Sequence, residues 1–168
     1  MTIDSQDLIV YNKGTKKEEV LQMKVTVKKI NFDMDGTLAD FYGVDGWLND
    51  LINSDPRPYA EAKPLFNFSA LARQIHRLQK LGYEVNIISW LSKSGTEDFN
   101  REVTEVKKAW LARHLPSVHF DHIIIVKYGT PKSTCGSGIL FDDEEQNRKE
   151  WNGKAYDVEN ILEVLRNI

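Results

Sequence analysis

Cysteine and histidine are scarce in this sequence, and their scarcity narrows the chemistry available to it. Cys135 is the single cysteine among 168 residues, so no disulfide can form within the chain, which favours a reducing compartment. No histidine-bearing motif accompanies Cys135, which makes it a weak candidate for a nucleophile. The four histidines lack the spacing of metal ligands and are expected at surface or boundary positions.

Long apolar runs and an excess of one charge sign are also missing. No stretch approaches the roughly 18 apolar residues of a membrane span, and the N-terminus lacks a signal-peptide pattern. The 22 basic and 25 acidic residues give a net charge of −3, which provides no overall basic field for a dedicated nucleic-acid surface. With 41% apolar and 28% charged residues, the composition is that of an ordinary globular protein. We therefore expect one cytoplasmic domain without a membrane partner.

Apolar periodicity divides most of the chain into alternating strands and helices. Residues 1–22 are polar and poorly periodic, which predicts an N-terminal arm before a domain over 23–168. Such alternation is typical of βαβ units, so we expect an α/β fold with a parallel sheet covered on both faces. The predicted strands are 24–33, 83–89, 122–126, 138–141 and 153–158, and the predicted helices are 68–82, 99–115 and the C-terminal segment 158–168.

Polar side chains gather where these predicted strands end. In parallel α/β sheets the functional crevice lies beyond the carboxyl ends of the strands, so we expect these side chains at one edge. The first strand ends in DMDGT, the second in NIIS and the fourth in FDDEE, and the loop KYGTPKS precedes the fourth. The residues concerned are Asp33, Asp35, Ser89, Lys127, Lys132, Asp142 and Asp143.

The chemistry of this set follows from its charges. Four carboxylates at one edge cost energy unless a cation neutralises them. Because no histidine or thiolate accompanies them, the set favours a hard cation bound by oxygen, most simply Mg²⁺. One carboxylate can then attack a phosphorus centre while a lysine and a hydroxyl hold the phosphoryl oxygens. The residues thus predict Mg²⁺-dependent phosphoryl transfer.

With these motifs the chain resembles the haloacid dehalogenase superfamily of phosphohydrolases. DMDGTLAD is similar to its first motif, NIIS to its second, Lys132 to its third and FDD to its fourth, in the family's order. A lysine ten residues before the acid pair, and the segment KKAWLARHLP, further resemble the 5'-nucleotidase and 5'(3')-deoxyribonucleotidase branch, small phage-type members included. The resemblance implies a three-layer Rossmann-like core with a minimal cap insert.

The resemblance also implies a role for each residue of the first motif. Asp33 is expected to be the nucleophile, which forms an aspartyl-phosphate intermediate and binds the metal. Asp35 is expected to be the general acid and base, and its backbone carbonyl to be a further metal ligand. Gly36 and Thr37 would supply backbone N–H groups to the phosphate oxygens. This set of roles is that of a phosphatase rather than a dehalogenase, because dehalogenases of the family lack an acid at the position of Asp35.

The remaining motifs complete the expected site. Ser89 and Lys132 would hold the transferring phosphoryl group. Asp143 is expected to bind Mg²⁺ directly, and Asp142 to bind it through water or to orient Lys132. Glu144 and Glu145 are expected to be solvated residues at a helix start.

Two assignments stay open on the sequence alone. Lys127 is the alternative to Lys132 as the third-motif lysine, although the ten-residue spacing favours Lys132. A nucleobase could stack on one of the aromatic rings next to the motifs, which are those of Trp90 and of Phe41 or Tyr42. Packing of these aromatic rings beneath the loops is an equally good interpretation.

Residues 41–66 are the only segment left for a cap over the site, enough for one or two short helices or a loop. We expect a phosphomonoesterase acting on a small phosphorylated substrate, in the first place a nucleoside monophosphate. A phosphate on a nucleic-acid end or on a protein side chain is the alternative substrate for the same chemistry. A non-catalytic binding protein with this fold is disfavoured, because no motif position has lost its functional group.

Overall fold

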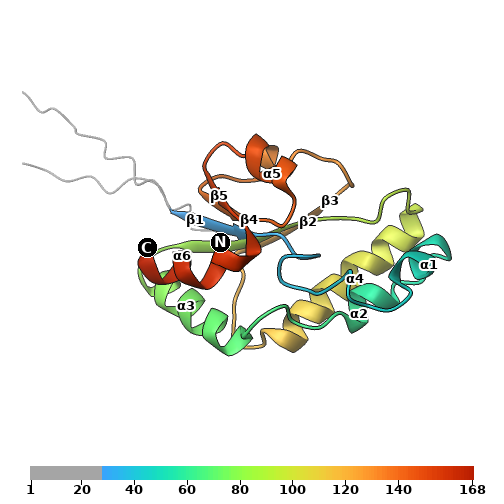
Figure 1. Cartoon of the computed structure of the whole chain (residues 1–168), viewed down its shortest axis with the longest axis horizontal. Helices are drawn as coiled ribbons and strands as arrows, with labels where there is room; N and C mark the ends of the chain where they lie inside the picture. The colour runs from blue at the N-terminus through green and yellow to red at the C-terminus, as the bar shows by residue number, and fades with distance from the viewer. Residues whose placement is uncertain (1–27) are drawn as a thin grey trace, which may run out of the picture.

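The computed structural model describes residues 28–168 and contains one parallel sheet with helices on both sides (Figure 1). The strand order is β3-β2-β1-β4-β5, and every neighbouring pair runs parallel. The strands are β1 (Lys29–Phe32), β2 (Glu84–Trp90), β3 (His122–Val126), β4 (Ile139–Phe141) and β5 (Lys154–Tyr156). The α/β class with a Rossmann-like parallel sheet, predicted from the sequence, is thereby confirmed.

Six α-helices and two short 3-10 helices connect and flank these strands in the described part of the chain. The α-helices are α1 (Trp47–Ile52), α2 (Arg57–Glu61), α3 (Phe68–Lys80), α4 (Glu97–His114), α5 (Glu145–Glu150) and α6 (Ile161–Asn167). The 3-10 helices are η1 (Lys132–Thr134) and η2 (Val158–Asn160). Within residues 28–168, no helix is both long and apolar enough to cross a membrane.

The two faces of the sheet carry different cores. Alternate strand residues such as Phe32 and Ile87 pack in the larger cluster, together with buried side chains of α3, α4 and α6. The opposite face buries Ile88 and Leu140 against Trp151, just beyond α5. Figure 1 shows α5 on one side of the sheet and α3 and α6 on the other. This alternation follows from the period of two along a strand.

The longer helices begin and end where local chemistry favours it. The side chain of Asn67 accepts a hydrogen bond from the backbone of Ala70 and caps α3, and Thr96 caps α4 through Phe99. After α3, Gly82 adopts φ +83°, a conformation that glycine enters without steric cost. The following strand can therefore turn back at once onto the sheet.

The predicted element boundaries differ from the observed ones by a few residues. The helix predicted over 68–82 ends at Lys80, and the one predicted over 99–115 begins at Glu97. The C-terminal helical segment divides into η2 and α6. The predicted arm over residues 1–22 and the start of the strand predicted over 24–33 lie outside the described residues, and the division into an arm and a domain over 23–168 stays a prediction.

Residues 41–66 form α1, α2 and their connections, beside the N-terminal half of α4 (Figure 1). Phe41 and Tyr59 from this segment pack against Phe99 and Val103 of α4 in a separate small apolar cluster. The segment is thus fixed on α4 by this cluster, while Ala62 and Phe66 near its end pack in the larger cluster with the sheet. Its assignment as a cap stays a prediction.

Candidate functional site

The carboxyl ends of β1, β2 and β4 bring the motif residues to one edge of the sheet. Asp33 directly follows β1, Ser89 is the penultimate residue of β2, and Asp142 directly follows β4. Because β1 lies between β2 and β4, Asp33 at its end lies between the ends of these two strands. Of these side chains, Asp33 is 5% exposed and the other two are fully buried. The convergence that the sequence predicts at this edge is present in the structure.

Lys132 links two of the acids. Its Nζ atom lies 2.6 Å from Oδ1 of Asp33 and 2.7 Å from Oδ2 of Asp142. The lysine side chain is almost fully buried, so its attraction to the two carboxylates is weakly screened. Burial lowers the pKa of Lys132, but the two carboxylates outweigh this effect, so the net shift is upward. Lys127, in contrast, is exposed, so the structure brings Lys132 and not Lys127 to Asp33.

Asp142 and Asp143 are adjacent in sequence but have different surroundings. Asp142 is enclosed: besides Lys132, the side-chain amide of Asn147 and the backbone N–H of Glu144 donate hydrogen bonds to it. Asp143 is only half-buried and contacts the hydroxyl of Thr37, 3.2 Å from its Oδ1. One acid of the pair is therefore held inside the protein, and the other faces the site.

The turn after β1 has a shape that a side chain would prevent. Gly36 has φ +80°, and a Cβ atom there would lie 2.4 Å from Oδ2 of Asp143. The hydroxyl of Thr37 lies 3.3 Å from Oδ2 of Asp33 and accepts a 3.0 Å hydrogen bond from the backbone N–H of Asp143. Glycine at position 36 thus lets the first motif and the acid pair approach each other.

Asp33, Asp142 and Asp143 form the only group of potential metal ligands found among residues 28–168, with ligand atoms within 4.8 Å of one another. Burial, with the negative charges of Asp33 and Asp142, raises the pKa of Asp143 to about 7. Three carboxylates this close resist being ionised together unless a cation joins them. Oxygen ligands without histidine or thiolate fit a hard divalent cation.

Asp35 does not belong to this group and contacts a lysine that was not singled out in the sequence. Oδ2 of Asp35 lies 2.5 Å from the ammonium of Lys107 on α4, which also contacts Ser89. Burial raises the pKa of Asp35; Lys107 opposes this shift, and Asp33 adds to it. A signal was present, because Lys107 is four residues after Val103 and three before Trp110, on the buried face of the helix. Asn147 was likewise missed and carries no comparable signal.

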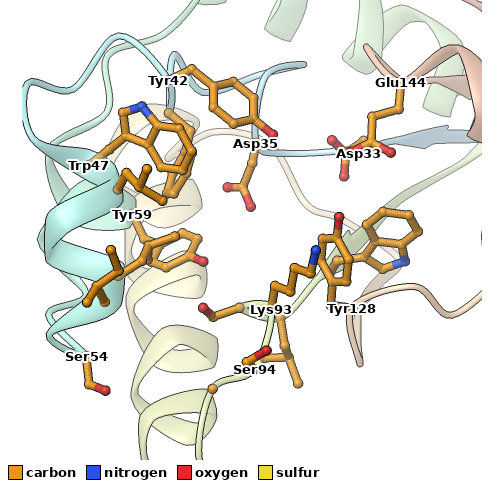
Figure 2. A pocket seen from close by; sticks show the side chains of 18 of the residues that line it. Asp33, Asp35, Tyr42, Trp47, Ser54, Tyr59, Lys93, Ser94, Tyr128 and Glu144 are labelled. Atoms are coloured by element: carbon orange, nitrogen blue, oxygen red, sulfur yellow. The ribbon is translucent and has the colours of Figure 1, made fainter.

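A cavity of about 490 Å³ opens beside Asp33 and Asp35. Figure 2 shows the carboxylate of Asp35 pointing into it, with Tyr42, Trp47 and Tyr59 on the side of α1 and Tyr128 on the opposite side. Apolar side chains of α1 also line the cavity. The aromatic lining residues are Phe41, Tyr42, Trp47, Tyr59, Trp90 and Tyr128.

The aromatic residues singled out in the sequence have distinct positions in this lining. Phe41 is 4% exposed and belongs to the small cluster on α4, whereas Tyr42 is half exposed. The ring of Trp90 contacts Tyr128, at a centroid distance of 5.0 Å, and its centroid lies 5.0 Å from the ammonium of Lys132. Tyr42 and Trp47 are in edge contact with centroids 5.3 Å apart. Phe41 is thus a packing residue, whereas Tyr42 and Trp90 border the cavity, and stacking of a nucleobase on them stays a prediction.

Comparison with known families identifies the chain. Residues 61–164, more than half of it, match the family model described as "5' nucleotidase, deoxy (Pyrimidine), cytosolic type C protein". The chain belongs to this family. The matched range contains Ser89, Lys132 and the acid pair, and it begins after Asp33 and Asp35. Membership in this 5'-nucleotidase family confirms the predicted superfamily and makes the chain a phosphatase of the haloacid dehalogenase type, a hydrolase of phosphoric monoesters.

Two solved structures are similar to the chain to different degrees. The D,D-heptose 1,7-bisphosphate phosphatase from Burkholderia thailandensis has a TM-score of 0.51 and 12% identity, over 83% of this chain and 97% of that one. The haloacid dehalogenase domain of the effector protein Lem4 from Legionella pneumophila gives a TM-score of 0.38 and 12% identity, over 78% of this chain and 85% of that one. No curated protein matches the chain significantly. At 12% identity the likeness to the heptose bisphosphate phosphatase shows the fold alone.

Proposed function

We propose that the protein is a Mg²⁺-dependent phosphomonoesterase that hydrolyses nucleoside 5'-monophosphates through an aspartyl-phosphate at Asp33. One observation carries this proposal: the Asp33 carboxylate, paired with the buried Lys132, opens onto a cavity lined by aromatic rings. A carboxylate held by a cation in this way has a fixed direction of attack. The aromatic lining provides a surface for a flat, apolar leaving group.

The residues of the site divide the proposed reaction between them. Asp33 attacks phosphorus, and Asp35 gives a proton to the leaving 5' oxygen and then takes one from the attacking water. Lys132 and Ser89 hold the phosphoryl oxygens as charge develops on them. The backbone N–H groups of Gly36 and Thr37, expected to bind phosphate oxygens, donate instead to the backbone oxygens of Ala39 at 2.8 Å and Met34 at 3.3 Å, so they have no part in this proposal.

The acidic group fits a bound Mg²⁺ ion. The ligands would be the carboxylates of Asp33 and Asp143 with the backbone carbonyl of Asp35, while the enclosed Asp142 orients Lys132 and binds at most through water. When bound, Mg²⁺ neutralises the acids and polarises the phosphoryl group. Asn147 donates hydrogen bonds to both carboxylate oxygens of Asp142 and so fixes this side chain, which supports the proposed role of Asp142 in orienting Lys132.

A nucleobase is the part of the substrate that the aromatic rings would recognise. The family's description names deoxy and pyrimidine 5'-nucleotides, so thymidine 5'-monophosphate is the first substrate to test. Deoxyribose 5-phosphate has the same scissile group without the base. We expect the protein to prefer the nucleotide, and a panel including a 5'-phosphorylated oligonucleotide and a phosphopeptide tests the alternative substrates. Faster hydrolysis of the oligonucleotide or peptide would contradict the proposed substrate class.

Replacement of one aromatic ring should remove part of this preference. Trp47 lies at the start of α1 and lines the cavity without contacting the acids (Figure 2). Loss of one stacking ring costs about 1–3 kcal/mol per base, so Trp47→Ala should raise the KM for thymidine 5'-monophosphate about tenfold. The kcat/KM for deoxyribose 5-phosphate should change little. Equal losses for both substrates would mean that Trp47 stabilises the site and does not bind the base.

The two lysines before β4 provide a matched pair of variants. Lys132→Met should raise the barrier by about 3 kcal/mol, the scale for losing one preorganised electrostatic contact. Lys127→Met should change the rate by less than about tenfold, because that side chain is exposed and away from Asp33. Rate constants at saturating Mg²⁺ with one substrate make the comparison. A crippled Lys127→Met variant would require the two roles to be exchanged.

A further inference from the structure

Lys107 is a fully buried lysine on α4 that connects two residues of the site. Its Nζ atom lies 2.5 Å from Oδ2 of Asp35, 2.8 Å from Oγ of Ser89 and 2.7 Å from the backbone oxygen of Trp90. An ammonium group has three N–H donors and no acceptor, so these three contacts use all of them. No donor is left for a substrate.

The contact with Lys107 holds the carboxyl group of Asp35 in one orientation. Oδ2 is tied to Lys107, whereas Oδ1 is buried and has no hydrogen-bond partner. The side chain points into the cavity, which it lines together with Asp33 (Figure 2). The carboxyl group of Asp35 is therefore held in one orientation beside Asp33, with one oxygen bound to Lys107 and the other still without a partner.

The contact with Ser89 determines the direction of its hydrogen bond. Lys107 can only donate, so Oγ of Ser89 accepts this bond and its own proton is free to point elsewhere. An acceptor such as a phosphoryl oxygen is what such a hydroxyl can serve. One buried ammonium thus sets the orientation of a carboxylic acid and of a hydroxyl, which come from different strands.

We propose that Lys107 is a positioning residue for proton transfer to the leaving group. It fixes the carboxyl group of Asp35 in one orientation beside the nucleophile, and it does not touch the substrate. This inference rests on the proposed phosphatase mechanism and names a further residue on which that mechanism depends. A purely structural ion pair would have the same geometry but would not discriminate between leaving groups.

Two substrates with different leaving groups distinguish these roles. An alkoxide, released from thymidine 5'-monophosphate, needs a proton as it departs, whereas p-nitrophenolate departs readily without one. In Lys107→Met the kcat/KM for the nucleotide should fall by about 100-fold, within the range for loss of general acid catalysis. The kcat/KM for p-nitrophenyl phosphate should fall by no more than about tenfold. The two losses then differ by at least a factor of ten, which corresponds to about 1.4 kcal/mol. The ratio of the two values is independent of the fraction of protein that is folded.

Matched variants complete this experiment. Lys108→Met removes the next lysine, which is exposed and paired with Glu105, and should leave both values unchanged. Lys107→Gln keeps two N–H donors and is the variant to use if Lys107→Met does not fold; it should shift the ratio in the same direction. Asp35→Asn should shift the ratio by itself, and adding Lys107→Met to it should cause little further shift, because both act through one group.

Two results would overturn the proposal. One is an equal loss of kcat/KM for both substrates in the Lys107 variants. The other is failure of both Lys107 variants to fold while Lys108→Met folds. Either result would show that Lys107 has a structural role only. Failure of the phosphatase mechanism itself gives a different pattern. In that case the unaltered protein releases no phosphate from either substrate with excess Mg²⁺, or Asp33→Asn retains activity.

Discussion

Asp33→Asn should lower kcat by about 10⁴-fold or more, on the scale seen when the nucleophile of a hydrolase is removed. An amide has the shape of a carboxylate but is a far poorer nucleophile, so the covalent intermediate cannot form. The fold should persist, because Lys132 keeps its 2.7 Å ion pair with Asp142. Removal of one of three close carboxylates also lowers their mutual repulsion.

The measurement for this variant combines phosphate release with circular dichroism and thermal unfolding. Asp45→Asn makes the same chemical change at an exposed aspartate outside the cavity and should retain full activity. A folded Asp33→Asn protein whose rate stays within about tenfold of the unaltered protein would contradict the role of Asp33 as nucleophile.

Removal of divalent metal should likewise abolish phosphate release, and Mg²⁺ should restore it. Without a divalent cation, the carboxylates of Asp33 and Asp143 repel each other, and the phosphoryl group is not polarised. Ca²⁺ should restore activity only in part, because its longer and looser coordination displaces the nucleophile. Full activity in chelator, or with Ca²⁺ as the sole metal, would count against this site.

Metal binding can also be measured without an activity assay, through the thermal stability of the protein. Mg²⁺ should raise the Tm of the metal-free protein, because a ligand that binds only the folded state stabilises it. Asp143→Asn should weaken this increase, since it removes a carboxylate that faces the site. An unchanged increase in that variant would mean that the ion binds elsewhere.

The sequence contains enough information for the fold and for most of the strand-end residues. The alternation of apolar runs predicts the parallel sheet. Because the carboxyl ends of parallel strands share an edge, the positions of Asp33, Ser89 and Asp142 in the sequence are sufficient to bring them together. The ten-residue spacing favours Lys132 over Lys127, and the geometry agrees because η1 turns the chain back toward β1.

Other features depend on packing that no local pattern specifies. The contact between Lys107 and Asp35 spans 72 residues and requires α4 to lie across the end of β2. A lysine within an apolar helix face is visible in the sequence, but its partner is not. The enclosure of Asp142 by Asn147, and the burial of Phe41 next to the half-exposed Tyr42, depend in the same way on how neighbouring elements pack.

The central claim, covalent catalysis at Asp33, is tested most directly by trapping the intermediate in Asp35→Asn, where its hydrolysis should be slow. After mixing with p-nitrophenyl phosphate and Mg²⁺, a borohydride quench reduces an acyl phosphate to an alcohol, so a phosphorylated aspartate becomes homoserine. Peptide mass spectrometry should find homoserine at position 33, in proportion to a burst of p-nitrophenol. A burst of p-nitrophenol with Asp33 unmodified, or homoserine at another position, would contradict the account.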